Sequence, residues 1–115
     1  MTRYRRGDVL LVRYPNSDQV TYKKRPVLVV QGETVRTGLP QFLVVAITSN
    51  LRRTGEIRVF VAKDGDEGRR MGLLTDSVIM ADNMAAVIPR EADKTIGHCM
   101  IMPKVDRALR RILRL

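Results

Sequence analysis

Cysteine, aromatic residues and long apolar runs are all scarce in this chain. Its 115 residues include one cysteine, no tryptophan, and only 4% phenylalanine, tyrosine and tryptophan together. One cysteine cannot form an internal disulfide, and the longest apolar run, six residues, is far shorter than a membrane span. The single histidine stands beside the cysteine, as His98 and Cys99, which leaves too few of these ligands for a zinc centre. The sequence therefore predicts no metal, no cofactor and no membrane segment, and a location in the cytoplasm.

Acidic residues are also in short supply relative to basic ones. Twenty-one Lys and Arg stand against twelve Asp and Glu, which gives a formal net charge of +9 and a pI near 10.6. The excess lies mainly at the two ends, with eight bases against three acids in residues 1–36 and seven against three in residues 90–115. Such a field attracts polyanions, nucleic acid first, although an anionic membrane surface or an acidic protein would respond to it as well.

The pattern of apolar residues predicts one mainly β domain over residues 1–115. There is no repeat and no linker, and short apolar runs are separated by Gly, Pro and Asn. The expected strands are residues 9–14, 26–31, 42–48 and 57–61, two apolar stretches at 77–80 and 84–88 broken at Asp82 and Asn83, and a last strand at 96–102. Residues 63–72 are expected to form a hydrophilic loop. The expected fold is a small twisted β-barrel closed by a helix.

The closing helix is predicted by a change of period after Pro103, a residue favoured in the first turn of a helix. Apolar residues then recur at helical spacing on one side: Val105, Ala108, Leu109 and Ile112. Basic residues occupy the other side: Lys104, Arg107, Arg110, Arg111 and Arg114. The apolar stripe predicts a core or dimer contact, and the basic face either contacts RNA or is solvated.

A basic segment at the start of one expected strand and a hydroxyl-rich segment at the end of the next predict a phosphate site. Lys23–Pro26 precedes the apolar Val27–Val30, and Thr48–Asn50 ends the following strand. The proline fixes its own backbone and pushes Arg25 toward an extended conformation, so the guanidinium leaves the sheet at a defined point. Arginine binds phosphate through two parallel hydrogen bonds, and hydroxyls add further donors.

Five short motifs occur in an order that resembles the MazF/PemK-type toxins. They are Arg6–Val9, Lys24–Val30, Ile47–Asn50, Gly72-Leu73 followed by Asp76–Val78, and Ile96-Gly97 before the terminal helix. The resemblance implies a Src-homology-3-like β-barrel of short antiparallel strands with a C-terminal α-helix, which forms a homodimer. It implies an mRNA interferase, a toxin that cleaves single-stranded RNA without metal and is neutralised by a small antitoxin with an acidic, poorly ordered tail.

The resemblance also implies which residues form the site. Arg25 and Thr48 match the two recurrent catalytic positions of the family, where they would stabilise charge on the phosphate during attack by the RNA 2′-hydroxyl. Arginine is a poor base because its pKa lies above about 12, and the general base stays unassigned, with Asp18 and Asp76 as the best-placed carboxylates. The predicted RNA-binding residues are Asn16, Ser17, Asp18, Lys23, Lys24, Ser49, Asp76, Ser77, Asp82 and Asn83.

The chain departs from many relatives after residue 80. An acid-Gln-Ile-Arg-Thr stretch is common there, whereas this chain has Asp82–Ala86, and Ala85 cannot bind a phosphate. The cleavage sequence is therefore not transferable from relatives. Two other functions stay open: a gyrase-poisoning toxin on a related barrel, and an RNA-binding module that does not cut.

Overall fold

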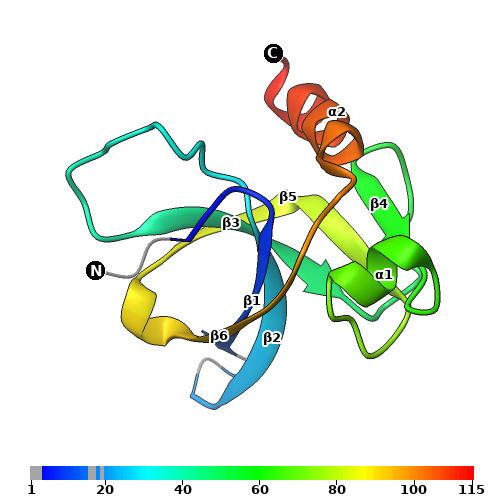
Figure 1. Ribbon diagram of the computed structural model, residues 1–115, viewed down its shortest axis with the longest axis horizontal. Helices are drawn as coiled ribbons and strands as arrows, with labels where there is room; N and C mark the ends of the chain where they lie inside the picture. The colour runs from blue at the N-terminus through cyan, green and yellow to red at the C-terminus, as the bar shows by residue number, and fades with distance from the viewer. Residues whose placement is uncertain (1–3, 16–17, 19) are drawn as a thin grey trace.

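The protein is described by a computed structural model that covers residues 4–15, 18 and 20–115 (Figure 1). In chain order its elements are β1 (Asp8–Pro15), β2 (Tyr22–Val29), β3 (Phe42–Thr48), β4 (Arg58–Val61), α1 (Asp66–Arg70), β5 (Ser77–Val87), the short 3₁₀ helix η1 (Pro89–Glu91), β6 (Ala92–His98) and α2 (Met102–Leu113). The prediction of a mainly β chain with a C-terminal helix is confirmed. Within the described residues, no helix is long and apolar enough to cross a bilayer.

The six strands form one antiparallel sheet in the order β4-β5-β3-β2-β1-β6. The sheet is strongly curved, as Figure 1 shows, but it is not closed into a barrel. Strands β4 and β6 are its two edges, and no pairing joins them in the described part of the chain. The antiparallel prediction is thus confirmed, while the expected closed barrel is an open, curled sheet.

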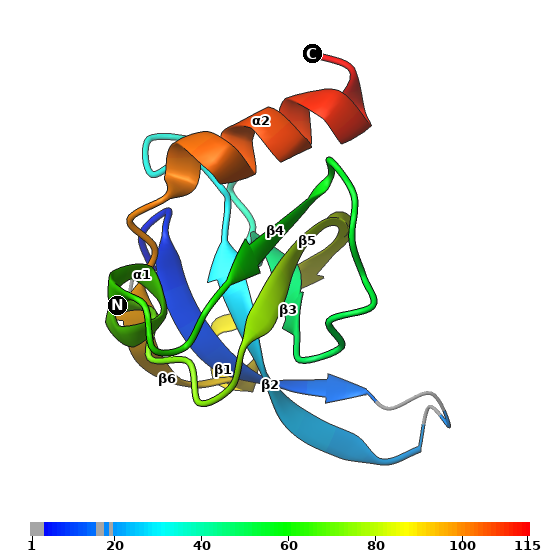
Figure 2. The same ribbon diagram turned by 90° about the vertical axis from the view of Figure 1, so that its right-hand side faces the viewer.

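Strand β2 begins four residues earlier than the sequence predicts, and this extension contains the basic segment. Residues 22–26 pair with β1 alone, Val27 and Leu28 pair with both β1 and β3, and Val29 pairs with β3. The charged half of β2 is therefore part of a two-stranded ribbon that projects beyond the rest of the sheet (Figure 2). Charged side chains are tolerated there because the ribbon is exposed to solvent, a context that apolar periodicity does not detect.

The apolar stretches predicted at 77–80 and 84–88 are joined in a single strand, β5, which ends at Val87 and has an irregularity between them. Val45 of β3 pairs with Met84, and the next residue, Ala46, pairs with Met80. Residues 81–83 are therefore extra on the β5 side, as in a β-bulge, and the break predicted at Asp82 and Asn83 is a bend within a continuous strand.

Three further expectations differ from the structure. The expected loop at 63–72 contains the helical turn α1, and β6 spans 92–98 rather than 96–102 because the chain turns into α2 at Met102. Of the predicted apolar stripe on α2, Val105 and Ala108 are buried and Leu109 packs on the core, but Ile112 is 42% exposed.

The curved sheet buries apolar side chains on both of its faces, in two separate clusters. One cluster lies between the sheet and α2 and includes Val9, Leu28, Val45, Ile79 and Val105. The other occupies the opposite face around Leu10, Val12, Val27, Val29 and Val44. Successive residues of β1 and β2 thus enter different clusters, which is the two-residue period of a strand buried on both sides.

Candidate functional site

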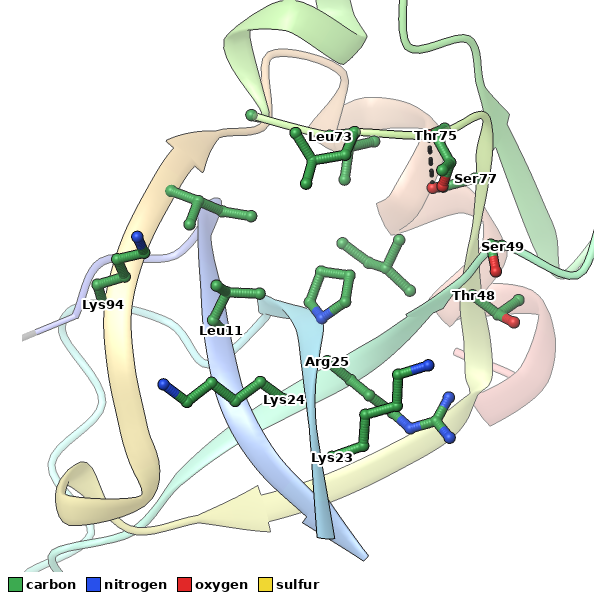
Figure 3. Close-up of a pocket in the computed structure, with 15 residues that line it drawn as sticks. Leu11, Lys23, Lys24, Arg25, Thr48, Ser49, Leu73, Thr75, Ser77 and Lys94 are labelled. Carbon is green, nitrogen blue, oxygen red and sulfur yellow. Dashed lines mark hydrogen bonds between the residues drawn. The ribbon is translucent and has the colours of Figure 1, made fainter. Parts of the chain in front are cut away.

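A cavity of about 390 Å³ lies beside the projecting ribbon, and it unites segments far apart in the sequence (Figure 3). Its lining residues come from β1, β2, β3, β5, β6 and the segment before β5: Leu11, Lys23, Lys24, Arg25, Pro26, Ile47, Thr48, Ser49, Gly72, Leu73, Leu74, Thr75, Ser77, Lys94 and Ile96. Both predicted catalytic positions, Arg25 and Thr48, are among them.

The extended β2 backbone positions the basic side chains. Lys23 and Arg25 are two residues apart, so they leave the same face of β2, and Figure 3 shows both extending to the side where Thr48 and Ser49 lie. Lys24 extends to the other side, where its Nζ lies 3.1 Å from an Asp93 carboxylate oxygen. The two cations nearest the hydroxyls are therefore held by a regular strand and not by the loop at 16–21.

The hydroxyl groups of the pocket are oriented by the backbone beside them. Thr48 Oγ1 accepts a hydrogen bond from the Asn50 N–H at 3.1 Å, which leaves its own proton to be donated. Ser77 is 3% exposed and donates its hydroxyl to the Thr75 carbonyl at 2.9 Å (Figure 3). Ser49 is exposed at the end of β3. Of these hydroxyls, Thr48 keeps its proton available to a bound group, whereas the proton of Ser77 is already donated to Thr75.

The far wall of the pocket depends on two glycines that allow backbones to touch. Gly72 has φ +72°, and a Cβ placed on it would lie 2.1 Å from the Ile96 carbonyl oxygen. A Cβ on Gly97 would lie 2.3 Å from the Arg70 carbonyl oxygen. The Gly72-Leu73 and Ile96-Gly97 motifs therefore meet in space, where α1 leads into the chain that lines the pocket.

The charge of the pocket is of one sign. Four cations line it, Lys23, Lys24, Arg25 and Lys94, and none of the described lining residues is acidic. Lys94 was missed by sequence reasoning, as was Thr75. No pattern in the sequence places Lys94 near Arg25. The structure brings it there through β1, because Leu11 of β1 pairs with Pro26 of β2 on one side and with Lys94 of β6 on the other.

Several predicted RNA-binding residues are not brought to this pocket. Asp76 accepts a hydrogen bond from the Lys63 N–H at 3.0 Å, and Asn83 accepts one from the Tyr14 hydroxyl at 3.2 Å. Asp82 is held by Arg58 across two contacts of 2.6 and 3.4 Å. The predictions for Asn16 and Ser17 lie outside the described residues.

Two aspartates are stabilised in the charged form, Asp18 by its own turn and Asp82 by an arginine of β4. Hydrogen bonds from the backbone N–H groups of Thr21 and Val20, and then from the Thr21 hydroxyl, lower the pKa of Asp18. The hydrogen bond from Arg58 lowers the pKa of Asp82. A lowered pKa makes a carboxylate a weaker base, so neither group is poised to accept a proton near neutral pH.

His98 and Cys99 are adjacent in the chain but differ in burial. His98 is exposed, with Nδ1 3.1 Å from Asp8 Oδ1, whereas Cys99 is buried and its burial raises the pKa of its thiol. Among the described residues, no three His, Cys, Asp or Glu side chains gather in a group that could hold a metal ion.

The fold and the pocket define a small antiparallel β protein with a site suited to a polyanion. Residues 5–113 match the family model of the PemK-like, MazF-like toxins of type II toxin–antitoxin systems. The chain belongs to this family, which confirms the resemblance seen in the sequence motifs.

Solved structures share the fold at low sequence identity. An endoribonuclease from mycobacterial species, in complex with its cognate antitoxin, has a TM-score of 0.74 and 23% identity, over 98% of this chain and 97% of that one. The Mycobacterium tuberculosis toxin MazF-mt6 has a TM-score of 0.73 and 24% identity, over 94% and 97%. MazF in a MazE–MazF structure from Deinococcus radiodurans has a TM-score of 0.71 and 13% identity, over 100% and 99%. A sequence comparison with curated proteins finds no match.

Proposed function

We propose that this toxin is an endoribonuclease that cleaves single-stranded RNA without a metal ion. The observation that carries the proposal is the meeting of Arg25 and Thr48 in one basic pocket. A site of this composition binds a phosphodiester, because the guanidinium and ammonium groups offset its charge while hydroxyls donate to its oxygens. The solved endoribonucleases of the same fold support this choice of reaction.

The reaction is an attack of the RNA 2′-hydroxyl on the adjacent phosphorus. The 2′-oxygen forms a bond to phosphorus and loses its proton, the bond from phosphorus to the 5′-oxygen breaks, and that oxygen gains a proton. The products are a 2′,3′-cyclic phosphate and a 5′-hydroxyl. In this scheme Arg25 stabilises the charge that develops on the phosphate, and the Thr48 hydroxyl donates to one of its oxygens.

We assign the proton transfers to groups of the pocket itself, because neither Asp18 nor Asp76 is among its described lining residues. Asp18 is occupied by its own turn and Asp76 by the Lys63 backbone. The lining groups that carry transferable protons are the lysine ammonium groups and the hydroxyls. Lys23, on the same face of β2 as Arg25, is suited to protonating the leaving 5′-oxygen.

Cleavage of a long single-stranded RNA should persist in EDTA and leave 2′,3′-cyclic phosphate ends. The reason is that the described lining residues offer no acidic or imidazole ligands of the kind a two-metal nuclease uses. The measurement is a cleavage assay with and without chelator, followed by sequencing and chemical identification of the ends. Loss of activity on chelation would overturn the metal-independent reaction.

The same assay separates the two alternatives. Tight RNA binding with no new ends would favour an RNA-binding module. Intact RNA together with inhibition of purified gyrase would favour a gyrase-poisoning toxin. Neither result is expected, because an arginine and a hydroxyl that line one basic pocket are groups suited to chemistry at phosphorus.

A small acidic antitoxin is the proposed inhibitor, acting in the cytoplasm. Two solved structures of this fold contain an antitoxin, the mycobacterial complex and the Deinococcus radiodurans MazE–MazF structure. An acidic, poorly ordered tail that folds on binding would be attracted by the four cations of the pocket. RNA and the inhibitor would then compete for one site.

Charge reversal of Lys23 and Lys24 to glutamate should weaken binding of both RNA and the antitoxin, and should reduce the salt dependence of each. Both side chains are exposed, so the fold should persist. The matched control is Arg36→Glu with Arg90→Glu, two exposed positions outside the pocket. If the pocket variant lost RNA binding but bound the antitoxin as before, inhibition would have to act at another surface.

A homodimer is also proposed, because a second copy would place two basic pockets on one RNA. Light scattering at micromolar concentration that gave only the 13.1 kDa mass of one chain would contradict it.

A further inference from the structure

A second basic groove lies on α2, and the cleavage scheme does not use it. It has a volume of about 830 Å³ and is lined by Arg107, Arg110, Arg111 and Arg114, by Glu56 from the loop between β3 and β4, and by the exposed Ile112 and Leu115. It shares no lining residue with the pocket around Arg25. In Figure 2, α2 lies at the top of the molecule, and the projecting β1–β2 ribbon at the bottom.

The arginines of the groove outnumber the acidic side chains that pair with them. Arg111 is paired with Glu56 at 3.0 Å, and Asp106, the acidic residue of α2, is paired with Arg6. In the described part of the chain, Arg107, Arg110 and Arg114 have no ion-pair partner. A helix C-terminus favours a cation, but its partial charge is only about half an elementary charge. The arginine cluster therefore exceeds what the helix end requires.

The arginines lie toward the C-terminal end of α2. Arg107 and Arg110 are three residues apart, so they share one face of α2, and Arg114 follows as the C-cap residue with a left-handed backbone at φ 57°. Ile112 and Leu115, 42% and 87% exposed, give the groove an apolar surface beside them. Unstacked RNA bases pack on apolar side chains and on guanidinium planes, while the phosphates pair with the charges.

One loop joins the groove to the cleavage pocket. Thr48 and Ser49 line the pocket, and Glu56, seven residues after Ser49, lines the groove. Between them lie Arg52 and Arg53, both exposed. Figure 2 shows this loop rising along the right-hand edge of the molecule, from the end of β3 to the side of α2. A chain that leaves the pocket past Ser49 would thus meet basic side chains along its way to α2.

We infer that the α2 groove binds the phosphate backbone of RNA that flanks the cleavage site. The identity of the polyanion as RNA rests on the proposed function. The location of the binding surface rests on the charge and the lining of the groove itself. The groove adds affinity for long RNA without acting on the scissile phosphate. The loop arginines, Arg52 and Arg53, bridge the two sites.

The test compares two triple variants that each remove three positive charges. The groove variant is Arg107→Gln, Arg110→Gln and Arg114→Gln. The control is Arg36→Gln, Arg90→Gln and Lys104→Gln, which are exposed positions outside the groove and the pocket, the last of them on the same helix. Circular dichroism and thermal unfolding verify that both variants fold.

Binding is measured with fully 2′-O-methylated RNA, in which the attacking hydroxyl is blocked, so binding is read apart from cleavage. For a long RNA, the groove variant should bind about tenfold more weakly than the control, and its log–log salt slope should fall by about 2, as expected for the loss of three phosphate contacts. A short RNA that covers only the cut site should bind all proteins equally. With unmodified long RNA, KM should rise and kcat stay unchanged.

Equal binding of long RNA by the groove variant and the control would overturn the inference. So would a groove variant that keeps its RNA affinity but loses the antitoxin or changes its oligomeric state, because the groove would then be a protein interface. If the wild-type protein cleaved no RNA but bound the methylated RNA through the groove, the proposed function would fall, while the assignment of the groove as an RNA-binding surface would stand.

Discussion

Replacing Arg25 with alanine should lower the rate of RNA cleavage by roughly two to three orders of magnitude, as is typical when a preorganised donor to a developing charge is removed. The side chain is exposed on a strand that pairs with β1 through its backbone, so the protein should remain folded. The effect should fall mainly on kcat, because Lys23, Lys24 and Lys94 still attract the phosphate.

Two matched variants separate charge from geometry at this site. Arg25→Lys keeps the charge but loses the planar fork, so it should restore only a small part of the lost rate. Thr48→Ala should cost somewhat less than Arg25→Ala, and Thr48→Ser, which keeps the hydroxyl, should cost little. A folded Arg25→Ala protein that cleaved RNA at the wild-type rate would show that the reaction takes place elsewhere.

Replacing Gly72 with alanine should destabilise the protein by about 3 kcal/mol or more, a large part of a typical domain stability. Two causes add. The left-handed backbone at φ +72° disfavours any residue with a Cβ, and that Cβ would meet the Ile96 carbonyl oxygen at 2.1 Å. The wall of the pocket formed by Gly72–Thr75 would have to move away from β6. Urea unfolding gives the loss of stability directly.

Gly38 provides the control for the backbone term alone. Its φ is +78°, close to that of Gly72, but a Cβ built there has no atom within 4 Å. Gly38→Ala should therefore cost only about 1 to 2 kcal/mol, the price of the left-handed conformation itself. Equal losses for the two variants would mean that the close approach to Ile96 does not matter.

The strands that the sequence predicted well are those whose own apolar residues determine their burial. The 42–48 segment is the observed β3, β1 is one residue longer than predicted at each end, and β4 begins one residue later than predicted. The early start of β2 could not be predicted in the same way. Residues 22–26 are extended because β1 pairs with them, and their own side chains are charged and exposed.

The polar residues after position 75 show why a motif does not place a side chain. Asp76 belongs to a motif shared with the family, and Asp82 and Asn83 to the segment that departs from it, yet the contacts of all three are made with Lys63, Arg58 and Tyr14. Each partner comes from another strand or loop, so no local pattern reports it. Their roles in RNA binding stay predictions, without support from the pocket geometry.

The sequence by itself determined the charge of this protein, its mainly β character, its family motifs, and the candidates Arg25 and Thr48. The charge and the β character follow from composition and from patterns within a few residues, whereas Arg25 and Thr48 became catalytic candidates through the resemblance to the family. Only the tertiary structure decided that the sheet stays open, that Lys94 and Thr75 join the pocket, and that the motifs at Gly72 and Gly97 touch. The physical reason is that these features depend on contacts between segments distant in the chain, where pairing and packing outweigh local preference.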